Sequence, residues 1–251
     1  MFKKCLLLIC LFWSLPSFAA QTIAIVGAMD VEIQALLPKI DDQKIIHIGQ
    51  HAFYTGELEG QSVVVTKSGV GKVNAAMTTT LLIHQFKVDQ VIFTGIAGAS
   101  SAELNPLDVV ISTKLVQHDV DLTAFDSPKG LLPEQDDRFF YADKNLQQLA
   151  YQAAVKTLGE KKVYQGIIAS GDQFIANKAL VNQIHSEFGA MAVEMEGAAL
   201  AQVAQAFAVP YVVIRTISDK ADGSAHMTYS DLKQATADNS ARITLNMLKQ
   251  M

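Results

Sequence analysis

The chain has 251 residues, of which 50% are hydrophobic and 18% are charged, which is the composition of a globular protein rather than a disordered one. The formal net charge is −5 and the lysines are scattered without a basic stripe, so we do not expect a nucleic-acid partner. After the N-terminal segment, no uncharged stretch is long enough to span a bilayer, so we expect no membrane contact once that segment is removed.

The N-terminus has the pattern of a secretory signal peptide. Lys3 and Lys4 precede an apolar run over residues 5–13, and small residues stand at −3 and −1 of a cut after Ala19. An uncleaved membrane anchor is the alternative, but the run is about half of the roughly 20 residues that a spanning helix needs. We therefore predict a periplasmic or secreted mature protein.

Removal of this segment would leave a mature chain with no cysteine and a more negative net charge. Both cysteines, Cys5 and Cys10, lie in it, so the mature protein would have no thiol for a disulfide, a metal site or a nucleophile. Loss of Lys3 and Lys4 would take the net charge from −5 to −7. The remaining residues, about 230, suffice for one full core, and we find no linker or repeat. We predict a signal peptide over residues 1–19 and a single domain over residues 20–251.

The mature part alternates apolar runs with helical patterns. We expect strands at 22–26, 63–66, 90–94, 108–112, 166–170, 190–193 and 210–216, and helices at 29–37, 72–85, 145–158 and about 196–208. Continuous apolar strands that alternate with helices predict a three-layer α/β/α fold with a central mixed, mostly parallel twisted sheet. Such sheets bind ligands at the carboxyl ends of their strands.

Unusual residues follow the expected strands. They form the segments GAMDVE, SGVGK, TGIAG, SGDQFI, VEMEG and RTISD, which begin at residues 27, 68, 94, 170, 193 and 215. Each alone is ordinary turn chemistry. Six in series, with carboxylates at Glu32, Glu196 and Asp219, predict a functional site. For single residues the simpler alternatives stay open, because Glu32 would also favour a helix N-terminus and Asp219 could cap a turn.

The sequence lacks the motifs of several common catalytic and binding sites. His118 and His226 are far apart and no clustered metal-ligand pattern occurs, so we expect no metal. The sequence also lacks the nucleophile elbow GxSxG and the phosphate loop GxxxxGK[ST]. We expect neither a cofactor nor a serine nucleophile.

Taken together, the motifs GAMDVE, KSGVGKVNAA, TGIAGA, SGDQFI, VEMEGAA and RTISDKAD resemble those of bacterial 5′-methylthioadenosine/S-adenosylhomocysteine nucleosidases, in the purine nucleoside phosphorylase superfamily. The resemblance runs from about Thr22 to the C-terminus. It implies a nucleoside phosphorylase-like fold, a homodimer, and hydrolysis of the N-glycosidic bond of methylthioadenosine and/or adenosylhomocysteine with release of adenine. Aminodeoxyfutalosine and 5′-deoxyadenosine are further candidate substrates.

The resemblance also implies roles for the site residues. Glu32 would activate the attacking water, Asp219 would protonate N7 of the adenine, and Glu196 would hold the ribose hydroxyls. The other members of the expected site are Arg215 to orient Glu196, Met195 against the ribose, Phe174 stacked on the base, the Ile175 backbone at the base edge, Gly98 near the base, Val70 and Tyr229 around the 5′ group, and Ser218 as a further substrate-binding residue. Taken singly, Phe174, Ile175, Met195 and Tyr229 could equally be core residues.

These roles agree with the chemistry. Cleavage of a bond from ribose to an aromatic nitrogen leaves a cationic sugar and an anionic base, so an acid with a raised pKa is needed at the base. Asp219 follows an apolar strand, where burial would raise its pKa. Glu32 and Glu196 would place negative charge near the ribosyl cation.

One position departs from the family, and two alternatives compete. Ile96 stands where the family often has serine, so a hydroxyl is missing near the site. A phosphate-dependent phosphorylase would need arginines, but none of the three in the chain lies in the first two strand-end loops, and Glu32 would repel the anion. An exported nucleoside-binding protein would not need an acid at N7.

Overall fold

The computed structural model describes residues 21–221 and 225–251, so the predicted signal peptide lies outside the described residues. The strands are β1 (Thr22–Gly27), β2 (Asp41–Ile48), β3 (His51–Leu58), β4 (Gln61–Lys67), β5 (Gln90–Ala99), β6 (Val109–Gln117), β7 (Phe139–Tyr141), β8 (Val163–Ser170), β9 (Ala190–Glu194) and β10 (Tyr211–Asp219). The helices are α1 (Asp30–Ile33), α2 (Lys72–Phe86), α3 (Lys144–Leu158), α4 (Lys178–Phe188), α5 (Gly197–Ala206) and α6 (Ala225–Leu248).

The strands form one mixed sheet, which confirms the predicted fold class. Parallel ladders join β4, β1, β5 and β10 in one run and β6, β8 and β9 in another. Antiparallel ladders add β3 and β2 at the edge and connect β10 with β6 and β5 with β9. Because β5 pairs with both β10 and β9, five strands (β5, β10, β6, β8 and β9) close into a ring. The sequence did not predict this closure.

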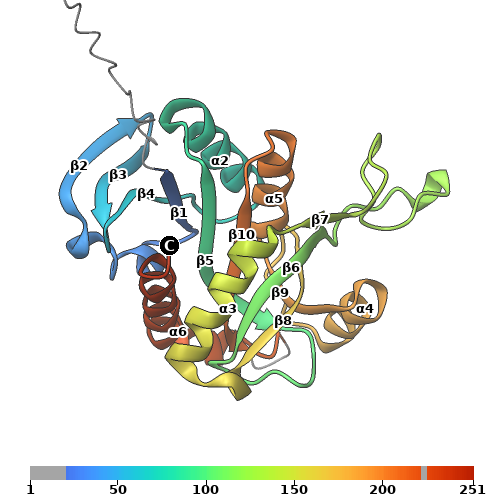
Figure 1. The fold of residues 1–251 in the computed structure, drawn as a ribbon. Helices are drawn as coiled ribbons and strands as arrows, with labels where there is room; N and C mark the ends of the chain where they lie inside the picture. Colours follow the sequence, from blue (N-terminus) through green and yellow to red (C-terminus); the bar gives the residue numbers. More distant parts are fainter. Residues whose placement is uncertain (1–20, 222–224) are drawn as a thin grey trace, which may run out of the picture.

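Helices cover both faces of the sheet (Figure 1), with α2 and α5 on one side and α1, α3 and α6 on the other. Consecutive residues of a strand face opposite sides of the sheet and pack into different hydrophobic cores. Phe93 packs with residues of α2 and α5, whereas Ile92 packs with residues of α1, α3 and α6. Burial on both faces is the reason that the central strands are continuously apolar.

Some elements differ from the expectation. The helix predicted over residues 29–37 is only the single turn α1 followed by a 3₁₀ turn at Leu37–Lys39, because Pro38 has no N–H to donate to the carbonyl of Gln34 and its ring would clash with that carbonyl in an α-helix. Strand β2 is exposed along nearly its whole length, so it has no apolar pattern to reveal it. Helices α4 and α6 and strands β3 and β7 were also not predicted.

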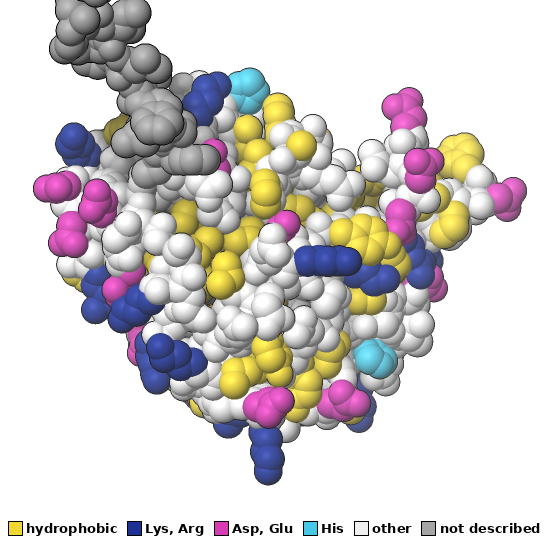
Figure 2. All heavy atoms as spheres, in the orientation of Figure 1, with side chains coloured by type: hydrophobic (Ala, Val, Ile, Leu, Met, Phe, Trp, Pro, Cys, Tyr) yellow, Lys and Arg dark blue, Asp and Glu magenta, His cyan; other side chains and the backbone are white. Residues whose placement is uncertain are grey.

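The surface shows two further features. Acidic and basic side chains are dispersed over the face in Figure 2, and the segment between β6 and β7 projects from the body of the molecule in both views. Among the described residues, none of the helices is long and apolar enough to cross a membrane.

Candidate active site

A cavity of about 310 Å³ opens at the ends of β1, β5, β9 and β10. Nine of the predicted site residues line it, namely Glu32, Val70, Gly98, Phe174, Met195, Glu196, Ser218, Asp219 and Tyr229. Ile175 lines a smaller adjoining cavity, and Arg215 lies fully buried beside Glu194 and Glu196. The structure therefore brings all eleven predicted positions into one region.

The register of the paired strands brings the site residues together. Gly98 on β5 pairs with Asp219 on β10 and also with Val193 on β9, so the ring closes at this glycine. A Cβ atom at Gly98 would lie 2.9 Å from the Cβ of Ala221 and 3.0 Å from Oδ1 of Asp219. Only glycine therefore lets the Asp219 carboxylate sit this close to β5.

Glu32 is held by backbone amides. Its Oε2 accepts hydrogen bonds from the N–H groups of Ala28 (2.6 Å) and Met29 (2.8 Å), and its Oε1 accepts one from Ile96 (3.0 Å). The residue is 2% exposed. Burial raises the pKa of Glu32, while Arg215 and the three amides act to lower it. The carboxylate is thus fixed in place without a direct ion pair among the described residues.

Glu196 and its neighbour Glu194 share one arginine. Arg215 donates to Oε2 of Glu194 from Nη2 (2.5 Å) and Nε (3.2 Å), while its Nη2 lies 3.8 Å from Oε2 of Glu196. The other oxygen of Glu196 accepts a hydrogen bond from the N–H of Gly71 at 2.8 Å. Glu194 thus takes the arginine, and Glu196 keeps only a distant ion pair with it.

Charge and burial set the ionisation of this group. Burial, followed by the negative charge of Glu194, raises the pKa of Glu196 to about 8, although Arg215 and Gly71 oppose the rise. Burial alone would lower the pKa of Arg215, but the carboxylates around it raise the pKa above its ordinary value. The guanidinium therefore stays charged.

A glycine makes room for this cluster. A Cβ atom at Gly95 would lie 2.5 Å from Nη1 of Arg215 and 2.6 Å from Oε1 of Glu32. The guanidinium also lies 4.1 Å from the ring centroid of Phe93. Gly95 is therefore the residue that allows Arg215 and Glu32 to face the same small space.

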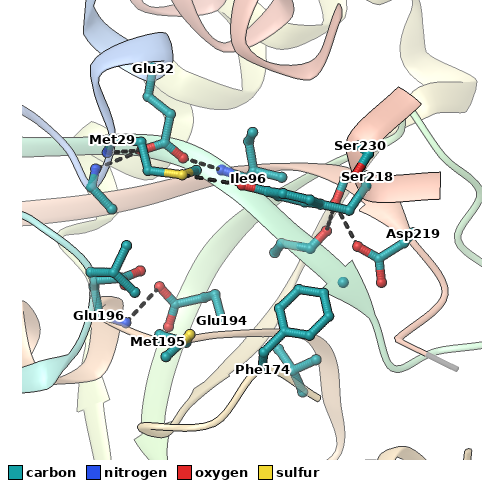
Figure 3. Close-up of a pocket in the computed structure, with 16 residues that line it drawn as sticks. Met29, Glu32, Ile96, Phe174, Glu194, Met195, Glu196, Ser218, Asp219 and Ser230 are labelled. Carbon is teal, nitrogen blue, oxygen red and sulfur yellow. Dashed lines mark hydrogen bonds between the residues drawn. The ribbon is translucent and has the colours of Figure 1, made fainter. Parts of the chain in front are cut away.

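Asp219 occupies the opposite side of the cavity from Glu196, as Figure 3 shows. Ser218 donates its hydroxyl to Oδ2 of Asp219 at 2.6 Å, and the N–H of Ala221 donates to Oδ1 at 2.7 Å. Asp219 is 3% exposed. Ser218 thus contacts the carboxyl group that was predicted to act as the acid.

The remaining walls are apolar and more open. Phe174 and Tyr229 meet edge to face with 5.9 Å between ring centroids, and the Tyr229 hydroxyl donates to the sulfur of Met29 at 3.2 Å. Phe174 is 52% exposed and Val70 is 47% exposed. Burial, and then the charges of the three carboxylates, raises the pKa of Tyr229, so its hydroxyl keeps its proton.

Sequence reasoning missed several residues that build the site. Met29 and Ser230 line the cavity, Gly71 and Gly95 shape it, and Glu194 was noted without a role. Their signals were present, because Gly71 has a positive φ of 98° and Glu194 ends an apolar strand. Both Glu194 and Glu196 line the cavity, and nothing in the local sequence says which of them keeps an acceptor oxygen for a ligand. The described residues hold no cluster of three His, Cys, Asp or Glu side chains that could bind a metal ion.

The fold and the strand-end cavity place the protein in a class of α/β enzymes whose site lies where strands end. A comparison with protein families matches residues 22–250 to the phosphorylase superfamily. The chain belongs to this superfamily.

Individual relatives are more specific. The chain is 44% identical over 230 residues to a 5′-methylthioadenosine/S-adenosylhomocysteine nucleosidase of Actinobacillus succinogenes, covering 91% of this chain and 99% of the relative. A mutant Helicobacter pylori nucleosidase, solved with 5′-methylthioadenosine in its active site, is similar with a TM-score of 0.88 and 39% identity, covering 93% of this chain and 100% of that one. A futalosine hydrolase of the same organism gives a TM-score of 0.88 and 39% identity, covering 92% and 99%.

Proposed function

We propose that the protein hydrolyses the N-glycosidic bond of 5′-substituted adenosines, with methylthioadenosine and adenosylhomocysteine as substrates and adenine as a product. One observation carries the proposal. Three buried carboxylates from separate strand ends, Glu32, Glu196 and Asp219, converge on a single cavity of nucleoside size. The names of the relatives supply the substrate class.

Asp219 has the position of the acid. The departing adenine carries negative charge, and a proton delivered to N7 neutralises it. Ser218 and the N–H of Ala221 both donate to Asp219, which fixes the direction of the carboxyl group. Phe174 lies beside it with an exposed ring face that can stack on the base.

Glu32 and Glu196 act on the sugar. Three backbone amides bind Glu32, two at Oε2 and one at Oε1, and leave one lone pair of Oε1 for an attacking water. Nη1 of Arg215, which has no hydrogen-bond partner among the described residues, is a second donor beside that position. Glu32 and the ionised form of Glu196 stabilise the ribosyl cation, and Glu196 accepts hydrogen bonds from the ribose hydroxyls.

Phosphorolysis has less support. Arg138 is paired with Glu187, Arg242 is exposed on α6, and Arg215 is engaged by Glu194. Within the described part of the chain, the residues that line the cavity include no Lys or Arg. A phosphate dianion would meet the carboxylate of Glu32 without a bidentate arginine.

The test is release of adenine from methylthioadenosine by the purified mature protein in phosphate-free buffer. We expect turnover, and Asp219→Asn should lower kcat by about 10²–10⁴-fold because the acid is lost. Asp238→Asn, an exposed carboxyl on α6, is the matched control and should leave kcat unchanged. Strict dependence on phosphate, or full activity of Asp219→Asn, would contradict the proposal.

We also propose that a second copy of the chain covers the apolar groove between α2 and α5. Val73 and Phe207 line this groove and are exposed by 77% and 45%, and Met77, also on α2, is exposed by 42%. A homodimer would bury these side chains. Sedimentation should give twice the chain mass, and Val73→Asp should shift the protein toward the monomer; a monomeric parent protein would refute this.

We propose that the protein is exported, on the strength of the N-terminal charge, apolar run and small residues around Ala19. Cell fractionation and N-terminal sequencing test this directly. We expect a periplasmic or secreted protein that begins near Ala20, whereas a cytoplasmic protein that keeps Met1 would contradict export.

A further inference from the structure

The N-terminus of α5 is capped in an unusual way. The first amides of a helix need acceptors, and the N-cap side chain ordinarily supplies one. Glu196 is the N-cap residue of α5, yet among the described residues its side chain accepts no bond from that helix. Its carboxylate instead accepts the N–H of Gly71 from another loop.

The caps come from two neighbouring strand ends. Gly197 donates its N–H to both oxygens of Glu194, at 3.0 and 2.8 Å, and Ala198 donates its N–H to the hydroxyl of Ser170 at 2.7 Å. Ser170 in turn donates to Oε1 of Glu194. The side chain two residues before the N-cap position thus does what the N-cap side chain usually does.

Glu194 also binds the arginine that lies nearest to Glu196. Both its oxygens are occupied, because Oε2 accepts from Arg215 and from the N–H of Glu196 (3.2 Å) while Oε1 accepts from Ser170 and Gly197. Its side chain is 2% exposed. No lone pair is left to accept a substrate hydroxyl, so Glu194 does not act on the substrate itself.

We propose that Glu194 is a positioning residue for the ribose end of the site. It caps α5 and occupies Arg215, and it thereby leaves the Glu196 carboxylate free to face the ribose hydroxyls. This inference rests on the proposed function, because it requires Glu196 to bind the ribose.

The carboxylates of Glu194 and Glu196 compete for the guanidinium of Arg215. Nη2 of Arg215 is 2.5 Å from Glu194 and 3.8 Å from Glu196, so Glu196 is the next carboxylate to which this nitrogen can turn. The charged groups that act on Glu196 are Glu194, Arg215 and Glu32, from β9, β10 and α1. Without the negative charge at Glu194, the attraction between Arg215 and Glu196 is no longer shared. Glu196 then turns toward Arg215 and away from the cavity.

The experiment compares Glu194→Gln with the parent enzyme on methylthioadenosine and on its 2′-deoxy analogue. Glutamine keeps the size of glutamate but has no charge and only one acceptor oxygen in place of two, so it binds Arg215 less strongly than glutamate does. In the parent enzyme we expect loss of the hydroxyl to lower kcat/KM about 10–100-fold, as for a hydrogen bond to a charged group. We call the ratio of kcat/KM for methylthioadenosine to kcat/KM for its 2′-deoxy analogue the hydroxyl ratio. In Glu194→Gln the hydroxyl ratio should fall to about threefold or less.

A second readout is the pH profile of kcat/KM. The charge of Glu194 helps to raise the pKa of Glu196 to about 8. Its removal should therefore move the kinetic pKa of Glu196 to lower pH. A loss of packing alone would lower activity without moving that pKa.

Two controls separate positioning from folding. Ser170→Ala removes one cap of α5 but leaves the pair of Arg215 with Glu194, so it should keep the full hydroxyl ratio. Inhibition by adenine should change by less than about threefold in Glu194→Gln, because the base end is untouched. If Glu194→Gln does not fold, Glu194→Asp takes its place, since its shorter side chain cannot span Arg215 and Gly197 together and should lower the ratio partly.

The outcomes distinguish a failure of the proposed function from a failure of the role proposed for Glu194. A parent enzyme that is indifferent to the 2′ hydroxyl would overturn the ribose role of Glu196, and with it the proposed function. A parent that needs the hydroxyl, together with a Glu194→Gln or Glu194→Asp variant that keeps both the ratio and the pH profile, would overturn the role of Glu194. The same would follow if Ser170→Ala reproduced the whole effect, since capping alone would then explain it.

Discussion

The cavity has two kinds of wall, and they are built differently. The carboxylate wall (Glu32, Glu196 and Asp219) is at most 5% exposed, and backbone amides or a buried hydroxyl hold each carboxylate. The apolar wall includes Phe174 and Val70, which are about half exposed. Charges that act in a transition state must be held in place before the substrate arrives, whereas an apolar wall can be completed by the ligand itself.

Substitution of Glu32 tests the carboxylate wall most severely. Glu32→Gln keeps the shape, but its amide group would face the N–H of Ala28 or Ile96 and cannot take a proton from water. We expect kcat to fall about 10²–10⁴-fold, measured by adenine release. Glu57→Gln, on the exposed side of β3, is the control and should have no effect. An unchanged kcat in Glu32→Gln would remove Glu32 from the mechanism.

The carboxylate wall should also cost stability in a pH-dependent way. The pKa of Glu196 is about 8 in the folded protein and its ordinary value is 4.5, so the folded state holds a proton that the unfolded state has lost between these values. The contribution of Glu196 to the free energy of unfolding is full below about pH 4.5 and is lost as the pH rises through about 8.

Glu196→Gln removes this titration. We expect the variant to gain about 2–4 kcal/mol over the parent when the pH is raised from 4.5 to 8.5, as measured by urea denaturation across that range. The gain should come with a loss of activity, as is common for residues of active sites. A stability difference that does not vary with pH would show that Glu196 is ionised at all these pH values.

Substitutions in the apolar wall should have smaller effects than substitutions in the carboxylate wall, and the effects should appear in KM. Phe174→Ala removes a ring that stacks on the base, a contact worth about 1–3 kcal/mol, so KM should rise about 5–100-fold while kcat changes little. Because Phe174 is half exposed, the free energy of unfolding should change by less than about 0.5 kcal/mol. A large fall in kcat at constant KM would instead make Phe174 part of the preorganised wall.

Much of the fold follows from local pattern. The apolar runs marked the central strands correctly because those strands are buried on both faces, and the glycine and carboxylate segments after them marked the cavity. The pattern failed where elements are half exposed or polar, as in β2 and α6. It also ended three strands too early, because the glycines of β5, the second half of β6 and the last residues of β10 continue their ladders.

The sequence by itself predicted the fold class, and it predicted that carboxylates gather at the strand ends, since strand burial and strand-end chemistry are local properties. The tertiary structure alone decided the ring of strands and the division of labour between Glu194 and Glu196. Those two residues are nearly identical in local context, and they differ only in what reaches them. Arg215 comes from β10 and Gly71 precedes α2, and Gly71 lies 125 residues from Glu196 in the chain. Contacts over such separations depend on strand register, which no short segment of the sequence contains.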